Sequence, residues 1–307
     1  MARPLGWHAL DEGSIIPLVR LILRFLLLLL LSLPTAATAA ELKVATWNLE
    51  WLTPRPAGDP ALPPDVRPKA AEDVARLARY AALLDADVVA FEEVDGPEIA
   101  ARVFPPDRYT LHLTADRVVQ RTGLAIRRGI AFTPNPDLTA LDLYAADAPY
   151  RLRSGADVTL HLRSGTLRVL ALHLKTGCRS DPLATSRRSE CHTLAAQLAP
   201  LQAWVAARTS EGVPFVLLGD FNRWMDGGDA FWAGLTRSGP VARATAGHSS
   251  PCWGGEQFID HIIAGGGATG WLEPDTLRVL VFRETGEEWK RRLSDHCPVS
   301  VRLRLPD

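Results

Sequence analysis

Polar residues follow apolar runs at several points along this chain, a pattern typical of β-strands that carry polar side chains to their ends. Residues 216–219 are Val, Leu, Leu and Gly, and Asp220 and Asn222 come next, separated by one residue. Side chains alternate between the faces of a strand, so both polar groups are expected on one side, where the strand leaves the core. Asp and Asn also favour turns at strand ends, which is the simpler interpretation of this pair.

Similar apolar runs predict further strands along the chain, and segments with apolar residues at helical spacing separate some of them. The longer helices are expected over residues 70–84 and 189–207, the second kinked at Pro200, and shorter ones near 97–103 and 228–235. The predicted strands cover residues 42–48, 88–91, 109–113, 122–127, 158–162, 167–175, 213–219, 258–263, 276–282 and 299–305.

The order of these elements predicts the fold class. Strands alternate with helices early in the chain, and hairpins occupy its middle, which favours an α/β fold of two mixed β-sheets packed as a sandwich and flanked by helices. The chain shows no internal repeat and no obvious linker, so one compact domain is expected. If that sandwich forms, the polar strand ends should converge at one edge.

The amino terminus resembles an export signal. Arg20 and Arg24 precede an apolar stretch at residues 25–33, and the small-residue run at 36–40 offers a cleavage site after Ala39. We therefore expect residues 1–39 to be a signal peptide, residues 40–307 to be the mature domain, and the protein to be secreted or periplasmic. The apolar stretch is shorter than the about 20 residues that span a bilayer, so no stable membrane anchor is expected. The segment before Arg20 is unusually long, which leaves a downstream start codon open.

The charge balance limits the classes of partner. The net charge is −1, and 22% of residues are charged, so no global positive field favours nucleic acid. Local basic groups such as Arg127 and the run at residues 290–292 are candidates for phosphate contacts, although a run of like charges is also typical of a solvated face.

The four cysteines indicate disulfides, because an even count in an exported chain is typical of an oxidising compartment. Four cysteines allow three pairings, and the sequence leaves all three open. We favour Cys178 with Cys191, which would close the loop after His173, and Cys252 with Cys297. No short Cys-x-x-Cys spacing supports the alternative of a zinc site.

The residues at or near the predicted strand ends form a set suited to phosphate chemistry. Carboxylates and side-chain amides are hard oxygen donors that suit Mg²⁺ or Mn²⁺ and suit zinc poorly. Phosphoryl transfer needs a cation on the nonbridging oxygens, donors around the phosphate and a base to orient the attacking water. The candidates are Asn48, Glu50, Glu93, His173, Asp220, Asn222, Asp260, Asp295 and His296.

Six short segments carrying these residues resemble the endonuclease/exonuclease/phosphatase superfamily, whose fold is the four-layer DNase-I-like fold, over nearly all of residues 42–305. Each segment is short, but all six stand in the family's order. They are residues 45–50 (ATWNLE), 90–94 (AFEEV), 172–174 (LHL), 219–222 (GDFN), 258–261 (FIDH) and 294–298 (SDHCP).

The resemblance implies a metal centre at four of the candidates. Glu93 would be the principal ligand of Mg²⁺ or Mn²⁺, Asn48 and Glu50 would assist it, and Asp295 would lie near the ion. Where the family usually has Gln before this glutamate, the chain has Glu92. The extra carboxylate either points to the opposite face or tunes the number of metal ions.

The resemblance also implies catalytic roles for the remaining residues. Asp220 would orient the attacking water and Asn222 would hold the phosphate. His296, paired with Asp260, would act on the phosphate or as a general acid/base. His173 would be the second histidine, which contacts the phosphate in the DNase I and sphingomyelinase branches.

Other residues near these motifs have simpler interpretations. Trp51, Trp224 and Trp253 could form a rim that stacks bases or packs acyl chains, but core or rim packing is the more common role of such residues. His261 has the opposite strand parity from Asp260, so we expect a structural histidine.

These observations predict an exported, monomeric, divalent-metal-dependent phosphoesterase, most simply a phosphodiesterase or nuclease that hydrolyses nucleic acid through an activated water. One alternative keeps this chemistry on a phospholipid such as sphingomyelin or on a small phosphoester. Another, from a different class, is a non-catalytic binding module on the same scaffold. The sequence cannot separate these substrates, because specificity would depend on loops such as residues 54–68 and 115–121.

Overall fold

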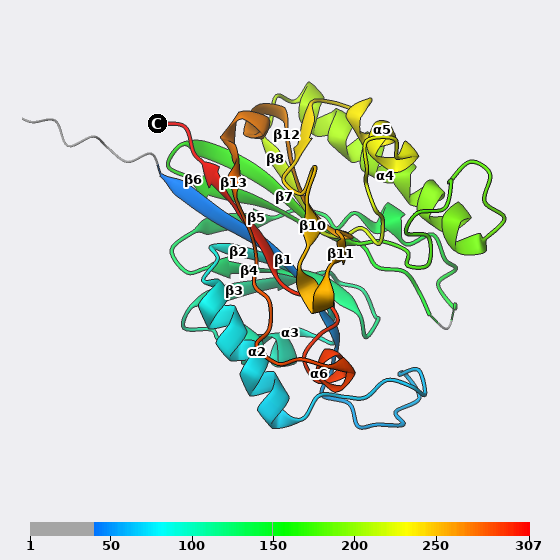
Figure 1. The fold of residues 1–307 in the computed structure, drawn as a ribbon. Helices are drawn as coiled ribbons and strands as arrows, with labels where there is room; N and C mark the ends of the chain where they lie inside the picture. Colours follow the sequence, from blue (N-terminus) through cyan, green and yellow to red (C-terminus); the bar gives the residue numbers. More distant parts are fainter. Residues whose placement is uncertain (1–39, 149) are drawn as a thin grey trace, which may run out of the picture. The chain divides into compact units, whose positions relative to one another are not determined.

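The computed structural model describes residues 40–148 and 150–307. The predicted signal segment, residues 1–39, lies outside the described residues, so export remains a prediction. The described chain forms two six-stranded β-sheets with helices flanking them (Figure 1). This arrangement confirms the predicted fold class.

The first sheet combines strands from the two ends of the described chain. Its order is β13 (Leu272–Val279), β14 (Val299–Arg304), β1 (Glu41–Leu52), β2 (Val88–Val94), β4 (Arg121–Arg127) and β3 (Tyr109–Leu113).

The second sheet comes from the middle of the chain. Its order is β5 (Ala131–Pro134), β6 (Ala156–Leu162), β7 (Gly165–His173), β8 (Phe215–Asp220), β12 (Asp260–Gly265) and β9 (Val241–Arg243). A separate two-stranded ribbon joins β10 (Ser249–Ser250) to β11 (Glu256–Gln257).

Each sheet has one parallel strand pair at its centre. In the first sheet β1 pairs with β2, and α2 (Ala71–Leu84) connects them; in the second, β7 pairs with β8 through α4 (Ser189–Ser210). Parallel neighbours need a long crossover, which a helix supplies. The other strand pairs are antiparallel, so both sheets are mixed as predicted.

Three hydrophobic clusters hold four layers together. The central cluster joins the facing sides of the two sheets and includes Val44, Ala90, Val169 and Leu218. The second packs the first sheet against α2 and α3 (Pro97–Val103), and the third packs the second sheet against α4 and α5 (Ala230–Thr236). Both outer faces are thus covered, which explains why the central strands are apolar on both sides.

The rows of side chains between the sheets change from apolar to polar at one edge. On β1, Val44 belongs to the central cluster, and Asn48 follows four residues later on the same face. The same parity links Leu218 to Asp220 on β8 and Ile262 to Asp260 on β12. Strand parity therefore places a polar group from several strands at one mouth of the sandwich.

Both favoured disulfides are confirmed. Cys178–Cys191 ties the loop after β7 to the first turn of α4, and Cys252–Cys297 ties the short 3₁₀ segment Cys252–Gly254 to the residue after His296. The second bridge closes a segment of 45 residues, so it limits how far the two loops can separate.

Several element boundaries differ from the prediction. β13 ends at Val279 instead of residue 282, because it follows β14 from Leu272 onward with a register shift between Glu273 and Arg278. The sequence did not predict β5, β9 or the six-residue helix α6 (Glu287–Arg292). These elements are short and gain their order from neighbours distant in sequence, which local patterns do not encode.

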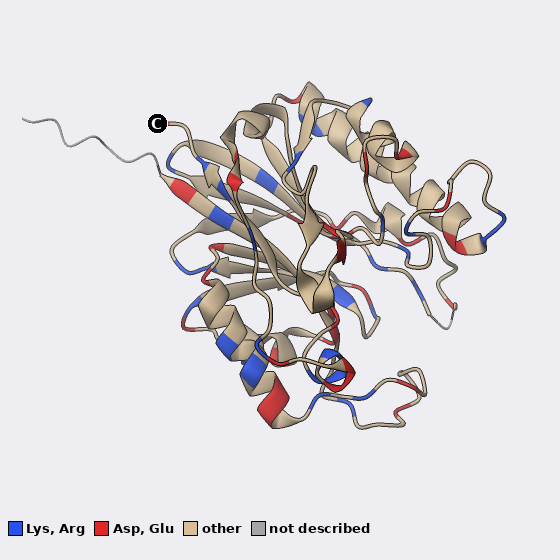
Figure 2. Ribbon diagram, viewed as in Figure 1, with Lys and Arg blue, Asp and Glu red and all other residues tan. Residues whose placement is uncertain are grey.

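The basic groups proposed as phosphate contacts are largely paired with acids. Arg127 contacts Asp85 and Asp87 at 2.7 and 2.8 Å, and Arg292 on α6 contacts Asp73 at 2.8 Å. Basic and acidic residues are interspersed over the loops and helices in Figure 2. Among the described residues, no helix is long and apolar enough to cross a membrane.

Gly219 is required where β8 runs beside β7, immediately before Asp220. A Cβ atom at this position would lie 1.9 Å from the carbonyl oxygen of Leu172 and would force the two strands apart. We expect Gly219→Ala to lower the free energy of unfolding by about 1–3 kcal/mol, measured by urea denaturation. Gly270→Ala is the matched control, because nothing lies within 4 Å of its added Cβ. Equal unfolding midpoints for the two variants would contradict this account.

Candidate active site

The candidate site lies where the carboxyl ends of both parallel strand pairs meet. Asn48 of β1 donates through Nδ2 to Glu93 Oε1 of β2 at 3.1 Å and to Asp220 Oδ2 of β8 at 3.2 Å. His173, at the end of β7, places Nε2 3.7 Å from Glu93 Oε1 and 3.6 Å from Asp220 Oδ2. The two sheets thus contribute equally to one cluster of polar groups.

Strand parity alone would not bring Glu93 into this cluster, since Glu92 faces the space between the sheets. Glu93 has a φ of 61°, and the pairing of β2 with β4 shifts register between Phe91 and Val94. Glu50 and Asn222 also have positive φ, at 44° and 53°. Such backbone is uncommon outside glycine and is characteristic of functional sites. Backbone distortion therefore positions these residues.

The expected metal-binding residues form one half of the site. The Trp51 N–H donates to Glu93 Oε2 at 3.1 Å, and the Glu50 N–H donates to Asn48 Oδ1 at 2.9 Å. Burial raises the pKa of Glu50 to about 7, nearby Lys69 opposes this shift, and Asp295 and Glu93 reinforce it. Glu50 Oε2 is buried and has no hydrogen-bond partner within the described part of the chain. An unpartnered carboxylate oxygen among hard oxygen donors fits Mg²⁺ or Mn²⁺.

Asp220 lies at the centre of the site and is almost fully buried. The Asn222 main-chain N–H donates to its Oδ1 at 2.7 Å, and Asn222 Nδ2 donates to its Oδ2 at 3.0 Å. Burial raises the pKa of Asp220 to about 7, although the charge of His296 acts in the opposite direction. The prediction that Asp220 and Asn222 share one side of the strand end is confirmed, and the two residues contact each other.

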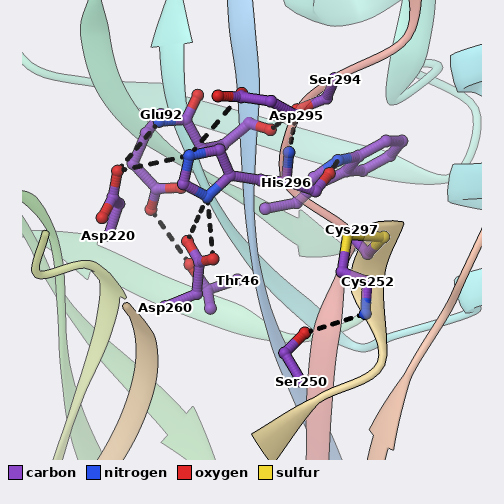
Figure 3. Close-up of polar contacts among 12 residues, drawn as sticks. Thr46, Glu92, Asp220, Ser250, Cys252, Asp260, Ser294, Asp295, His296 and Cys297 are labelled. Carbon is purple, nitrogen blue, oxygen red and sulfur yellow. Dashed lines mark hydrogen bonds and ion pairs between the residues drawn. A yellow bond between two sulfur atoms is a disulfide. The ribbon is translucent and has the colours of Figure 1, made fainter. Parts of the chain in front are cut away.

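His296 and Asp260 form the predicted pair. His296 Nδ1 lies 2.8 Å from Asp260 Oδ2, while its Nε2 faces Asp220 Oδ2 at 3.8 Å and Asp295 Oδ1 at 3.7 Å (Figure 3). Burial acts to lower the pKa of His296, but the carboxylates of Asp260, Asp295 and Asp220 outweigh it and hold this pKa well above the ordinary value. His296 is therefore an imidazolium oriented by Asp260.

His173 differs from His296 in charge. Burial lowers the pKa of His173 well below its usual range, and the cation of Arg153 adds to the effect. The imidazole is neutral, and its Nδ1 has no hydrogen-bond partner among the described residues. The site thus contains one charged and one neutral histidine, both close to Asp220 Oδ2.

Comparisons with known proteins agree with this geometry. The sequence profile described as "Endonuclease/Exonuclease/phosphatase family" matches residues 45–296. The chain belongs to the endonuclease/exonuclease/phosphatase family. Its members are phosphoesterase enzymes, and the match extends from the start of the first motif to His296.

Solved structures of the endonuclease/exonuclease/phosphatase fold superimpose on most of the chain. Truncated TDP2 of Caenorhabditis elegans has 14% identity and a TM-score of 0.57, and covers 86% of this chain and 98% of its own. The 3'-5' exonuclease NExo of Neisseria meningitidis has 16% identity, a TM-score of 0.55 and coverages of 85% and 98%. The human nocturnin catalytic domain has 15% identity, a TM-score of 0.54 and coverages of 85% and 93%. At these low identities, the TM-scores show a shared fold alone. No curated protein sequence matches the chain.

Within this family scaffold, two cations that the sequence patterns did not indicate lie close to the site. Lys69 donates to the Glu50 main-chain carbonyl at 2.6 Å, and its ammonium lies 3.6 Å from Glu50 Oε2. Arg153 is buried, donates to the Leu174 carbonyl at 3.4 Å, and acts electrostatically on Glu93 and Asp220. Both residues stand in irregular segments, where no periodicity marks them. The only signal in the sequence for these two residues was a basic side chain in a segment predicted to be a loop.

The remaining sequence predictions near the site have clear outcomes. His261 is buried, and its ring contacts Thr245 Oγ1 at 2.6 Å and the Arg223 carbonyl at 2.9 Å, which confirms a structural histidine. Trp253 donates through Nε1 to the Ser294 carbonyl at 3.0 Å and lines the same pocket as His296. It therefore belongs to the rim of the site.

Glu92, the departure from the family pattern, faces the space between the sheets. Its Oε1 accepts a hydrogen bond from Thr46 Oγ1 at 3.1 Å, and its Oε2 is buried without a partner (Figure 3). Burial raises the pKa of Glu92 well above its ordinary value, and the carboxylates of Asp260 and Asp220 raise it further. The side chain is therefore a neutral carboxylic acid beneath the site, a close counterpart of the family's usual glutamine.

The protonation of Glu92 predicts a pH-dependent effect of substitution. A carboxyl whose pKa is raised on folding contributes its full stability below the unfolded value of 4.5 and loses it as the pH rises toward the folded value. Glu92→Gln should therefore gain stability over the native protein as pH rises from 5 to 8, by up to about 1.4 kcal/mol per pH unit. Urea denaturation at several pH values measures this gain. A pH-independent difference would refute the assignment, and Glu98→Gln, which changes an exposed carboxyl, is the matched control.

The ion pair of His296 predicts a shift visible by NMR without any metal. Asp260→Asn removes the closest carboxylate, so the pKa of His296 should fall in imidazole titrations of the metal-free protein. A His296→Gln spectrum assigns the resonance, and Asp275→Asn, which changes an exposed carboxylate, serves as the control. An unchanged His296 pKa in Asp260→Asn would show that Asp260 does not hold its charge.

Proposed function

We propose that the protein is an exported, divalent-metal-dependent phosphodiesterase that hydrolyses nucleic acid by in-line attack of an activated water. The observation that supports this most directly is the position of Asp220. This carboxylate is held by Asn48 and Asn222 and faces the imidazolium of His296 across the site. A base, a cationic donor and a set of metal-binding oxygens are thus available around one reacting phosphate.

Different residues would bind the metal ion and activate the attacking water in the proposed reaction. Glu93, Glu50, Asn48 and Asp295 would hold Mg²⁺ or Mn²⁺, which supplies charge stabilisation to the phosphate oxygens when bound. Asp220, with its pKa raised to about 7, is suited to take a proton from the attacking water near neutral pH.

The side chains on the phosphate side act as donors. His296 would donate through Nε2 to a phosphate oxygen, while Asp260 keeps its ring charged and oriented. Asn222 and His173 would complete the phosphate contacts, with neutral His173 acting as a hydrogen-bond donor. Arg153 adds positive charge below the site and offsets the carboxylates.

One finding supports nucleic acid as the substrate, and another supports export of the protein. A structure of NExo, with a TM-score of 0.53 to this chain, holds a product DNA hairpin, so the shared scaffold accommodates a nucleic-acid substrate in that protein. The two disulfides favour an oxidising compartment. A phospholipid or a small phosphoester is the alternative substrate, and the assay below separates these outcomes.

The decisive experiment compares substrates and variants side by side. Purified mature protein with Mg²⁺ is expected to cleave plasmid DNA or RNA faster than sphingomyelin vesicles, and EDTA should abolish cleavage. Asp220→Asn should lower kcat by about 10²–10⁴-fold, because it removes the base while keeping the shape of the side chain. Gel assays and phosphate release give the rates.

The matched control is Asp107→Asn, which alters an exposed carboxylate on the α3–β3 loop and should leave cleavage unchanged. Circular dichroism verifies that both variants fold. Full activity in Asp220→Asn would overturn the assignment of the base, and cleavage of sphingomyelin alone would replace nucleic acid as the substrate.

A further inference from the structure

A second pocket lies beside the site and has no part in the chemistry described above. It has a volume of about 270 Å³, and its wall includes Trp51, Arg117, Val119, Tyr150 and Arg151. Trp51 connects it to the site, since the N–H of the same residue donates to Glu93 at 3.1 Å. A ligand in this pocket would therefore contact Trp51, which follows the expected metal ligand Glu50 in the sequence and donates to the expected ligand Glu93.

The charge of this pocket differs from that of the site. The pocket at His296 is lined by five carboxylates together with Arg179, Lys290 and Arg291, whereas the second pocket is lined by two arginines and no carboxylate. Arg151 pairs with the nearby Asp142, whose side chain is buried. Arg117 is exposed and has no ion-pair partner among residues 40–148 and 150–307. The free charge at this pocket is thus positive.

The remaining wall is apolar and aromatic. Tyr150 is 58% exposed, so its side chain is accessible to a ligand in the pocket that it lines. Its ring and that of Trp51 line a space flanked by Val118 and Val119. The volume lies just below the range for ligand pockets, about 300–1,000 Å³, so it suits a single ring system better than two acyl chains.

We propose that this pocket is a nucleoside-binding subsite, in which a base stacks against Tyr150 and Trp51 and Arg117 contacts an adjoining phosphate. The inference rests on the proposed phosphodiesterase activity and names its substrate class. Every base has a π-face that can stack on an aromatic side chain, and guanidinium groups bind phosphate. A choline group also favours aromatic rings, but its positive charge would be repelled by Arg117 and Arg151. The subsite therefore selects nucleotides over phosphocholine lipids.

The test uses three chromogenic diesters that share one leaving group. With Mg²⁺, Tyr150→Ala should raise KM for p-nitrophenyl thymidine 5′-phosphate roughly tenfold and leave kcat within about twofold, because stacking is the same in ground and transition states. KM for methyl p-nitrophenyl phosphate, which has no base, should not change. Tyr150→Phe should restore the native KM. Arg117→Ala should raise KM only for a nucleotide that carries a second phosphate, such as the 3′-phosphorylated form of the same thymidine diester.

The control is Tyr144→Ala, which removes an exposed aromatic ring that does not line the pocket. The subsite would be overturned if Tyr150→Ala raised KM equally for the nucleotide and for methyl p-nitrophenyl phosphate. It would also be overturned if Tyr150→Ala left KM for the nucleotide unchanged. A larger loss on p-nitrophenyl phosphorylcholine than on the nucleotide would overturn it in favour of a choline site.

Direct binding separates this proposal from the proposed function. Isothermal titration of thymidine 5′-monophosphate requires no turnover, and the native protein should bind it roughly tenfold more tightly than Tyr150→Ala does. If no diester is hydrolysed but this difference persists, the catalytic assignment fails and the subsite stands. If hydrolysis is observed but the nucleotide binds both proteins equally, the subsite fails alone.

Discussion

The buried carboxylate of Asp220 is the feature on which the site depends. Burying a carboxylate costs free energy unless hydrogen bonds and opposite charge compensate it. Here Asn48 reaches it from the first sheet, Asn222 from the turn after β8, and His296 from the segment before β14. The cost of burial is offset only when the two sheets are packed in this register, so the fold and the site require each other.

The residues around Asp220 are brought together by regular and irregular backbone in combination. Regular strand parity delivers Asn48, His173 and Asp260 to the mouth of the sandwich. Positive φ at Glu93 turns a further carboxylate toward them, against the parity of β2, and Glu50 near the end of β1 also has a positive φ. Strained backbone of this kind persists only where the surrounding structure fixes it. The covered outer faces and the Cys252–Cys297 bridge supply that constraint.

The charges at the site are balanced by groups from distant parts of the chain. Lys69 compensates Glu50 from the segment before α2, and Arg153 acts on Glu93 and Asp220 from the segment before β6. Burial raises the pKa of Glu92 and favours its protonated form, so this carboxyl needs no compensating cation. A bound divalent cation would add to this balance. The net charge of −1 for the whole chain gives no indication of these paired charges at the site.

The sequence by itself determined the elements and the list of candidates. Apolar runs predicted the central strands and the long helices, because burial on both faces leaves a strong local pattern. Six ordered motifs then indicated the family and the residues around Asp220 and His296. Spacing also predicted a structural role for His261, because alternation along the strand places it on the opposite face from Asp260.

Only the tertiary structure decided which groups touch and in what state of charge. Disulfide pairing depended on loop proximity, and the sequence left three pairings open. Lys69 and Arg153 stand in irregular loops, so their approach to the site had no periodic signal. The protonated state of Glu92, the neutral ring of His173 and the charged ring of His296 follow from burial and from neighbours on other strands. Local sequence does not encode these quantities, because they arise from contacts between residues far apart along the chain.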